Sequence, residues 1–381
     1  NMKQFDVAII GLGSMGSFAA LELAKRKLSV IGFDKYSPPH EEGSHGGDTR
    51  AFRTVYTEHP NYVPLIKRSL QIWDSLAEEW DLPLLTRSGV ISIGDPQSEL
   101  IKGIVQSASV YNLELQKLNS VEIHKQFPAL KPPEEFIGLI DCEAGLIDVP
   151  LAITNALKQA RQLGADLRIN QPALEWTSNK EDIFIDTNQE KISAKKLLVT
   201  AGALTSEILA SLDLPLVIRR QVLAWFKPYR SELFSPDCLP IFAFAPRGFY
   251  GFPNIGGGGV KIAHHERGDP LLGYPVKVPP VDEKDLNSLI SDVSKFIPSL
   301  INPDQDPLKQ IVKAKTCLYV MTPDGHCIID RDPHNDEIIF ATGFSGHGFK
   351  FSPVIAEALA DLVTAEVTSL PIDFLSMKGR F

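Results

Sequence analysis

The residues best suited to chemistry in this chain begin with a glycine-rich motif at residue 11. Gly11-Leu12-Gly13-Ser14-Met15-Gly16 follows the apolar run Phe5–Ile10 and precedes a segment with helical spacing from Ser17 to about Lys27. In such a motif the first glycine permits a tight turn, the second lets backbone approach a pyrophosphate, and the third lets the helix pack on the strand. Free N–H groups at the helix start attract an anion. The motif therefore predicts a nucleotide-phosphate site.

An acidic residue stands where a nucleotide ribose would lie. Asp34 ends the second apolar run, Leu28–Phe33, and lies 23 residues after Gly11. The acid that binds a ribose hydroxyl is expected about 20 residues after the first glycine. A carboxylate there repels a 2′-phosphate, which disfavours NADP. The motif does not separate NAD from FAD, and its structural alternative is a glycine turn in an ordinary α/β domain.

A second glycine-rich loop lies near the other end of the chain. Gly343-Phe344-Ser345-Gly346-His347-Gly348-Phe349-Lys350 follows the expected strand Glu337–Thr342 and precedes an expected helix over Ser352–Thr364. Strand, loop and helix start again form an anion cradle. Two such loops suit a long cofactor held at both ends. FAD is long enough, whereas a lone nucleotide would not need both loops.

Between these loops lies a third stretch that could bind an anion. Residues 43–50 are rich in glycine and end in Arg50, with Arg53 close behind. Arginine presents a planar, two-pronged donor that fits a carboxylate. The alternative is a solvated loop that carries surface charges, and composition alone leaves the two readings equal.

The elements that must position these residues predict an α/β fold (α+β overall). Apolar spacing predicts helices over Asn61–Trp80, Ser98–Tyr111 and Asp148–Leu163, the last with Asp148 as N-cap. It also predicts strands over Gly89–Gly94 and Ile192–Thr200, and β-rich alternation from about 216 to 316. We expect a Rossmann-like FAD-binding domain built from residues 1–85, 145–215 and 317–381. A mixed or antiparallel sheet would form a substrate-binding domain from residues 86–144 and 216–316.

Composition excludes several classes of function. The net charge of −9 over 381 residues disfavours nucleic acid as a partner, because phosphate binding needs a basic face. No apolar run is long enough to span a membrane, and the first apolar run is the nucleotide strand rather than a signal sequence. We therefore expect a cytoplasmic protein. Four widely spaced cysteines suggest free thiols, and no spacing fits a metal.

At this point the motifs resemble a known family. The resemblance to the monomeric sarcosine oxidase family, which includes N-methyl-tryptophan oxidase, covers essentially the whole chain. It rests on the first glycine motif, Pro38-Pro39-His40, Gly43-Ser44-His45, Gly47-Asp48-Thr49-Arg50 with Arg53, Tyr62-Val63-Pro64-Leu65, Tyr250-Gly251-Phe252-Pro253, Cys317-Leu318-Tyr319 with Thr322-Pro323-Asp324, and Gly343–Lys350.

The resemblance implies catalytic roles residue by residue. A substrate carboxylate would lie between Arg53 and Lys350, and Arg50 would lie over the flavin face. Lys261 would promote the reaction with oxygen. Other pocket residues would be Tyr250, His265 and Tyr319.

The resemblance also implies covalent FAD, linked through a cysteine thioether at Cys317. The alternative for Cys317 is a small buried hydrophobe, and Cys327 is its rival for the link. Motif and resemblance together assign cofactor contacts to Gly11, Gly13, Ser14, Met15, Gly16, Asp34, Lys35, Ser44, His45, Thr49, Arg50, Ala173, Gly202, Cys317, Gly346, Gly348, Phe349 and Lys350.

The implied reaction is oxidation of a secondary amine that carries a carboxylate, such as sarcosine, with oxygen reduced to hydrogen peroxide. The implied oligomeric state is a monomer. The chain departs from the family at Gly46, where a second histidine is common, and at Leu204, where tryptophan is common. We expect loss of the imidazole to open volume beside the catalytic face. Alternatives are another FAD amino-acid oxidase or dehydrogenase, or a non-catalytic nucleotide-binding protein.

Overall fold

The first elements of the computed structural model form a strand–turn–helix–strand unit. The structure describes residues 3–173, 175–179, 181–187, 189–265, 268–272 and 278–381. Strand β1 (Gln4–Ile10) leads through the glycine motif into helix α1 (Ser14–Lys25) and then β2 (Val30–Phe33). The expected helix start at Ser17 was wrong by one turn, because the helix begins inside the glycine motif with Gly13 as its N-cap. The first turn was missed because its residues belong to the glycine motif, which was interpreted as a turn.

The two strands of this unit belong to an eight-stranded sheet. Strand β1 pairs in parallel with β2 on one side and with β12 on the other. The other edge of β12 is shared, with β11 beside its first half and β20 beside its second. Besides β1 and β2, the strands of the sheet are β9 (Asp166–Arg168), β10 (Glu175–Ser178), β11 (Ile183–Asp186), β12 (Lys191–Val199), β19 (Ile328–Asp332) and β20 (Asn335–Thr342).

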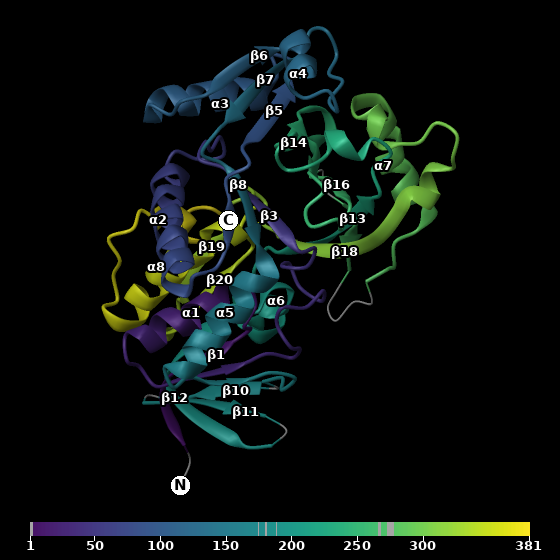
Figure 1. The fold of residues 1–381 in the computed structure, drawn as a ribbon. Helices are drawn as coiled ribbons and strands as arrows, with labels where there is room; N and C mark the ends of the chain where they lie inside the picture. Colours follow the sequence, from purple (N-terminus) through teal and green to yellow (C-terminus); the bar gives the residue numbers. More distant parts are fainter. Residues whose placement is uncertain (1–2, 174, 180, 188, 266–267, 273–277) are drawn as a thin grey trace.

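Helices cover one face of this sheet and bury the largest apolar core. They are α1, α2 (Tyr62–Trp80), α5 (Val149–Gln162) and α8 (Ser352–Thr364), and α1 packs directly against both α5 and α8. Figure 1 shows α1, α5 and α8 gathered on the sheet that contains β1 and β12. The predicted N-cap of α5 is confirmed, because the Asp148 carboxylate accepts a hydrogen bond from the Leu151 N–H at 2.9 Å. This hydrogen bond satisfies one of the free donors of the helix start.

A nine-stranded mixed sheet forms the second half of the molecule. Its order is β17-β13-β16-β15-β14-β5-β7-β6, with β18 on the other edge of β13. Helices α3 (Glu99–Tyr111) and α4 (Ser120–Gln126) belong to this half. The strands are β5 (Val90–Gly94), β6 (Gln116–Asn119), β7 (Ile137–Asp141), β13 (Val217–Phe226), β14 (Ile241–Phe244), β15 (Phe249–Phe252), β16 (Val260–His264), β17 (Pro270–Leu271) and β18 (Ile311–Met321).

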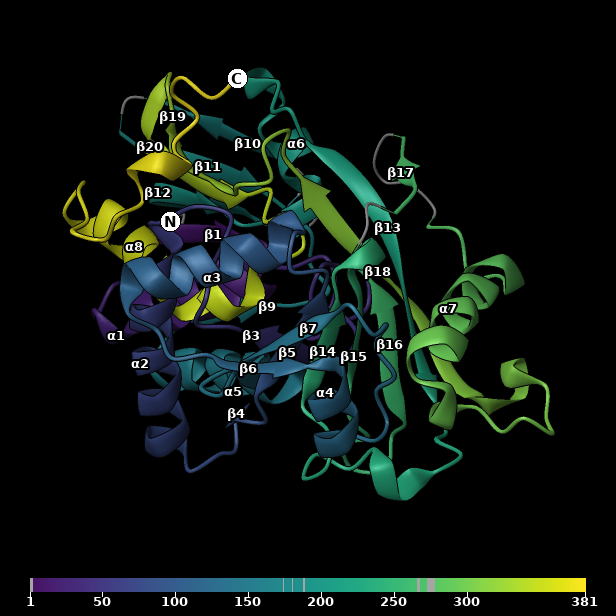
Figure 2. The same ribbon diagram turned by 90° about the horizontal axis from the view of Figure 1, so that it is seen from above.

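The expectation of only strands between 216 and 316 was incomplete. Helix α7 (Glu283–Phe296) lies in this region, and Figure 2 shows it on the far side of the nine-stranded sheet from α1 and α8. Its start has a capping box between Asp282 and Asp285, and Leu289, Val293 and Phe296 face the core at helical spacing. The capping box and the helical spacing are present in the sequence, but they lie in a region where most of the pattern indicates strands.

A small sheet joins the two halves. It consists of β3 (Thr49–Phe52), β8 (Gly145–Asp148) and β4 (Leu85–Thr86). The larger sheets draw their strands from the segments predicted for the two domains, except that β18 crosses the boundary at 316/317. The domain division itself stays a prediction. Among the described residues, no helix combines the length and apolarity that a membrane crossing requires.

Candidate active site

A single cavity of about 780 Å³ gathers the residues singled out in the sequence. Both glycine loops, the loop of residues 40–50 and the strands β14, β15, β16 and β18 contribute to its wall. All of the proposed catalytic residues line it, namely Arg50, Arg53, Tyr250, Lys261, His265, Tyr319 and Lys350. So do the proposed cofactor contacts, with the exception of Gly16. That residue lies behind the wall, where it serves packing.

Two glycines of the first motif are required by close backbone contacts. Gly11 has a φ of +95°, and a Cβ there would lie 2.5 Å from the Thr200 carbonyl oxygen. A Cβ on Gly16 would lie 1.8 Å from the Gly11 carbonyl oxygen. Both distances are far below van der Waals contact. Thr200 can therefore approach the turn after β1 only when position 11 lacks a side chain, and helix α1 can pack on that turn only when position 16 lacks one.

The start of α1 presents unpaired donors to the cavity. Gly13 makes no side-chain cap, and the first N–H of this helix with a backbone acceptor is that of Ser17. Within the described part of the chain, the N–H groups of Ser14, Met15 and Gly16 have no hydrogen-bond acceptor. Free donors at a helix N-terminus favour an anion. This end of the cavity fits the pyrophosphate of a dinucleotide.

Asp34 is fixed at the same end of the cavity. Its carboxylate accepts hydrogen bonds from the Leu12 N–H at 2.8 Å and the Tyr36 N–H at 2.9 Å. The side chain is buried beside the β2 terminus and lines the cavity. A carboxylate held in this way can accept a further hydrogen bond from a ribose hydroxyl. Lys35 and Ala173 line the cavity with it.

His45 is buried as a neutral imidazole. Its Nε2 accepts a hydrogen bond from the His40 N–H at 3.0 Å, so the remaining proton belongs on Nδ1. Burial and the neighbouring His40 lower its pKa to about 3. The Nδ1 edge faces Gly13, where a Cβ would lie 3.2 Å away. His45 therefore contributes a neutral donor next to the phosphate-binding turn.

The volume expected beside Gly46 is not empty. A Cβ at Gly46 would lie 2.4 Å from Oε2 of Glu41, whose Oε1 accepts from Lys315 Nζ at 2.5 Å. The expectation of open space was therefore wrong, because a paired carboxylate from the same loop occupies the position. The sequence could not show this, since the loop must fold back before residue 41 meets residue 46.

Sheet register places the remaining candidates on one face. Tyr250 pairs with Ala263, and Lys261 pairs with Phe252 on one side and Trp225 on the other. Because alternate residues of a strand share a face, residues two apart on β15, β16 and β18 point the same way. Cys317 and Tyr319 have this spacing on β18, and both line the cavity.

Lys261 is a buried cation surrounded by acceptors. Its Nζ donates to the carbonyl oxygens of Gly47 and Thr49 at 3.0 and 2.8 Å, and contacts Thr49 Oγ1 at 2.6 Å. Burial and the charge of Arg50 lower its pKa well below the ordinary value. Three acceptors nevertheless match the three N–H donors of the charged form. The site can thus hold an ammonium away from water.

Cys317 and Cys327 lie in different environments. The Cys317 sulfur lies 3.3 Å from the Nη2 of Arg50, which also donates to the Ser44 carbonyl at 2.9 Å. Cys327 is packed in the apolar core beneath the eight-stranded sheet and does not line the cavity. Burial raises the pKa of Cys327 to about 12. Of the two rivals, only Cys317 is placed to meet a group in the cavity.

Two cations share one aromatic ring at the other end of the cavity. The Arg53 guanidinium lies 4.9 Å from the centre of the Tyr56 ring, and Lys350 Nζ lies 5.2 Å from it. The Lys350 carbonyl accepts hydrogen bonds from Ser69 Oγ at 2.5 Å and Trp73 Nε1 at 3.0 Å, which anchors its backbone to α2. No acceptor among the described residues contacts Lys350 Nζ. Burial and the Arg53 charge lower the pKa of Lys350 well below its ordinary value.

Glu58 is a site residue that sequence reasoning missed. Its Oε1 lies 3.2 Å from Nη2 of Arg53, and the residue lines the cavity. Burial would raise its pKa, but the charges of Arg53, His347 and Lys350 outweigh this and hold it at about 2. Tyr56 and His347 were missed as well. No periodic pattern marks any of the three, because they meet only when the loop after β3 packs on the second glycine loop.

A smaller polar group completes the wall. His265 Nδ1 lies 3.2 Å from the hydroxyl of Tyr319, and the His265 ring lies near that of Tyr250. His265 reaches solvent through the open cavity, yet the surrounding protein and the Arg53 and Lys350 charges lower its pKa to about 4. Burial raises the pKa of both tyrosines. All three groups are therefore uncharged near neutral pH.

Sequence comparison gives relatives over the full chain. The monomeric sarcosine oxidase of Streptomyces avermitilis is 34% identical over 376 residues, covering 97% of this chain and 96% of the relative. The N-methyl-L-tryptophan oxidase of Salmonella agona is 31% identical over 372 residues, covering 97% of each chain.

Solved structures share the fold. NikD, an amino acid oxidase essential for nikkomycin biosynthesis, superposes with a TM-score of 0.85 at 21% identity, covering 98% of this chain and 97% of that one. Glycine oxidase from Geobacillus kaustophilus gives 0.82 at 20% identity, covering all of both chains. A family model described as DAO, FAD dependent oxidoreductase, matches residues 6–362. With its cavity and these matches, the chain belongs to the DAO family of FAD-dependent oxidoreductases.

Proposed function

We propose that the protein oxidises a secondary (N-methyl) amino acid such as sarcosine and passes the electrons to oxygen, giving hydrogen peroxide. The observation that carries this proposal is the pair of cations, Arg53 and Lys350, which lie near the Tyr56 ring and line the same cavity as the phosphate-binding turn. The names of the two full-length relatives support an N-methyl amino acid as substrate.

The residues present fit FAD along the whole cavity. The free N–H groups of Ser14 and Met15 would hold the pyrophosphate, and Asp34 the ribose. Gly346 and Gly348 would let the ring system lie close to the second glycine loop. The loop is already tightly packed there, because a Cβ added to Gly346 would lie 2.3 Å from the Tyr319 ring. When bound, FAD supplies the two-electron acceptor that no amino-acid side chain provides.

The cations would orient the substrate. Arg53 has five N–H donors, of which some are directed at Glu58 and Tyr56, and it can bind a carboxylate through two of the others. A carboxylate beside Lys350 favours the protonated form of that lysine and so offsets the effect of burial on its pKa. Fixing one end of a small amino acid in this way aims its nitrogen and the adjacent carbon. Orientation of this kind is worth orders of magnitude in rate.

Lys261 would assist the reaction with oxygen. Its ammonium is held by Gly47 and Thr49 at the cavity wall, where water is largely excluded. A fixed positive charge there stabilises the negative charge that oxygen gains on reduction. We propose that Cys317 forms the thioether link to the cofactor, since its sulfur lies on the cavity wall beside Arg50. The name of the sarcosine oxidase relative supports a monomer. A cytoplasmic location stays a prediction.

The test is a substrate screen on the purified yellow protein. N-methyl amino acids are compared with their unmethylated parents, glycine, D-amino acids and proline, and peroxide is measured under air. The proposal expects peroxide with at least one N-methyl amino acid at a kcat/KM well above that of its parent. Turnover of only primary or cyclic amines would overturn the substrate class. Bleaching without peroxide would indicate a dehydrogenase.

A further inference from the structure

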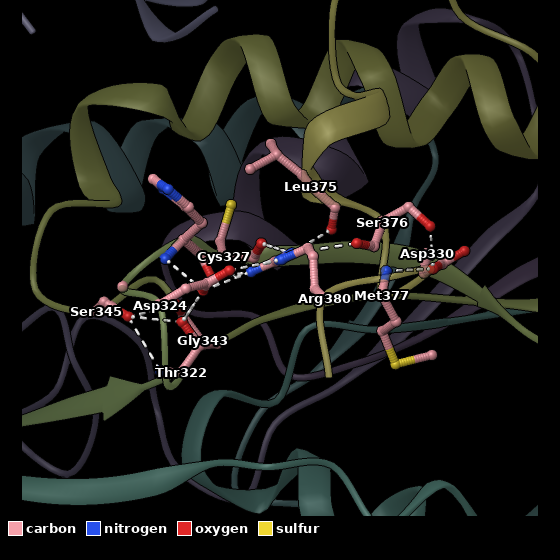
Figure 3. A network of polar contacts seen from close by, with 12 residues as sticks. Thr322, Asp324, Cys327, Asp330, Gly343, Ser345, Leu375, Ser376, Met377 and Arg380 are labelled. Atoms are coloured by element: carbon pink, nitrogen blue, oxygen red, sulfur yellow. Dashed lines mark hydrogen bonds and ion pairs between the residues drawn. The ribbon is translucent and has the colours of Figure 1, made fainter. Parts of the chain in front are cut away.

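The segment after α8 closes back onto the turn between β18 and β19 through one arginine. Arg380 donates to the two carboxylate oxygens of Asp324, from Nε at 2.9 Å and from Nη2 at 2.8 Å. Its side chain is only 12% exposed although the residue lies in an irregular segment. Figure 3 shows Arg380 at the centre of this polar network, below Leu375 and Ser376. A two-pronged pair of this kind fixes orientation as well as distance.

The remaining donors of Arg380 all bind backbone. Nη2 also donates to the His326 carbonyl at 2.8 Å, and Nη1 donates to the carbonyls of Cys327 and Leu375, each at 2.9 Å. All five N–H groups of the guanidinium are therefore used. The arginine ties the segment after α8 to Asp324, His326 and Cys327 in the turn formed by residues 322–327. A lysine could not reproduce this fork.

That turn is hydrogen-bonded to the second glycine loop. The Thr322 N–H donates to Ser345 Oγ at 3.2 Å, and Ser345 Oγ donates to the Gly343 carbonyl at 3.0 Å. The Thr322 hydroxyl lies 2.7 Å from the His326 carbonyl oxygen and 3.1 Å from Asp324 Oδ1. Arg380 binds both of these acceptors, so it fixes the groups that orient Thr322. Ser345 has a φ of +51°, a left-handed conformation that costs free energy for a residue with a side chain. The contacts from Thr322 help to maintain it.

A second link reaches the substrate end of the cavity. His347 Nε2 lies 2.9 Å from the Gly325 carbonyl, and Nδ1 lies 3.2 Å from the hydroxyl of Tyr56. Tyr56 is the ring shared by Arg53 and Lys350. Ser345, Gly346, His347 and Gly348 all line the cavity. Arg380, outside the cavity, is thus connected to Tyr56 through Asp324, the adjoining Gly325 and His347.

We propose that Arg380 is a positioning residue: by fixing the turn of residues 322–327 it holds the loop of residues 343–350 in the conformation that places His347 and Lys350. The assignment of Lys350 to the substrate rests on the proposed function. The fixing of the loop does not, and the two can be tested separately.

The experiment compares purified holoenzymes with the substitutions Arg380→Ala, Arg380→Lys and Asp324→Asn. The control is Lys378→Ala. Lys378 lies two residues before Arg380 and carries the same charge, but its side chain is exposed. Hydrogen–deuterium exchange is followed in peptides that cover 343–351 and, for reference, β1. Arg380→Ala is expected to speed exchange in 343–351 by about tenfold, the size of one lost charge-assisted hydrogen bond. The control and β1 should not change.

The other two variants test whether the two-pronged contact between Arg380 and Asp324 causes the protection. Arg380→Lys should recover little of the protection, and Asp324→Asn should give a smaller loss in the same peptides; it also serves if Arg380→Ala fails to fold. In turnover, KM for the best N-methyl amino acid should rise more than kcat falls. Unchanged exchange in 343–351, or equal acceleration in β1, overturns the proposal. If wild-type enzyme turns over no N-methyl amino acid, the proposed function fails while the exchange result still decides the role of Arg380.

Discussion

Replacement of Lys261 by methionine tests the proposed oxygen reaction most directly. The side chain is 3% exposed, so solvent screens its charge poorly. Two unit charges about 5 Å apart at an effective dielectric constant of about 20 interact by ~3 kcal/mol. Losing that stabilisation in the step that reduces oxygen slows it by about a hundredfold. The step in which substrate bleaches the enzyme creates no charge that only Lys261 can neutralise, and should change much less.

The assay measures the two half-reactions apart. Stopped-flow mixing with substrate without air gives the rate of bleaching, and mixing the bleached enzyme with oxygen gives the rate at which the yellow colour returns. Lys313→Met is the matched control, because Lys313 lies across Trp225 from Lys261 on the same sheet face but outside the cavity lining. Slower bleaching with normal recovery of colour would refute the role of Lys261. So would an equal effect of the Lys313 change.

The same substitution has a cost in stability. Methionine removes the Lys261 hydrogen bonds to the Gly47 and Thr49 carbonyls, which keep the Thr49 N–H at 2.8 Å and Arg50 Nη1 at 2.9 Å as their other donors. Loss of a hydrogen bond to a charged group costs about 1.5–3 kcal/mol, and removal of a buried ammonium offsets part of this cost. The urea midpoint should therefore fall modestly, and the half-reactions must be measured well below it.

Three further outcomes follow from the geometry. Cys317→Ser should release the yellow colour from acid-precipitated protein, and Cys327→Ser should not; colour retained in the former would refute the link. Gly16→Ala should give little holoenzyme, because its Cβ would lie 1.8 Å from the Gly11 oxygen, and normal cofactor content would contradict the packing. The pKa of His265, about 4 against an ordinary value near 6.5, keeps its imidazole neutral above about pH 6. His265→Gln should therefore leave the shape of the kcat/KM profile from about pH 6 to 9 unchanged, and loss of an ionisation there would disprove this.

Glycine turns and helix caps could be predicted from the sequence, because they depend on residues that are neighbours along the chain. The positive φ of Gly11, the contact of Gly16 with the Gly11 carbonyl and the Asp148 cap on α5 depend on residues within a few positions of each other along the chain. The contact of Gly11 with Thr200 is not local and required the fold. The start of α1 was missed because its first residues belong to the glycine motif, which was interpreted as a turn. Helix α7 was missed because its capping box lies in a region where most of the pattern indicates strands.

Only the tertiary structure decided which distant groups meet. The Tyr56 ring, next to Arg53, meets Lys350 and His347 once the loop after β3 packs on the second glycine loop. The Glu41 carboxylate lies beside Gly46 and is paired with Lys315 of the distant strand β18. Arg380 reaches Asp324 across 56 residues of chain. The backbone conformation of a residue and the side of an element that it occupies follow from near neighbours. The partner of a charge depends on how whole elements pack, and no short stretch of sequence contains that information.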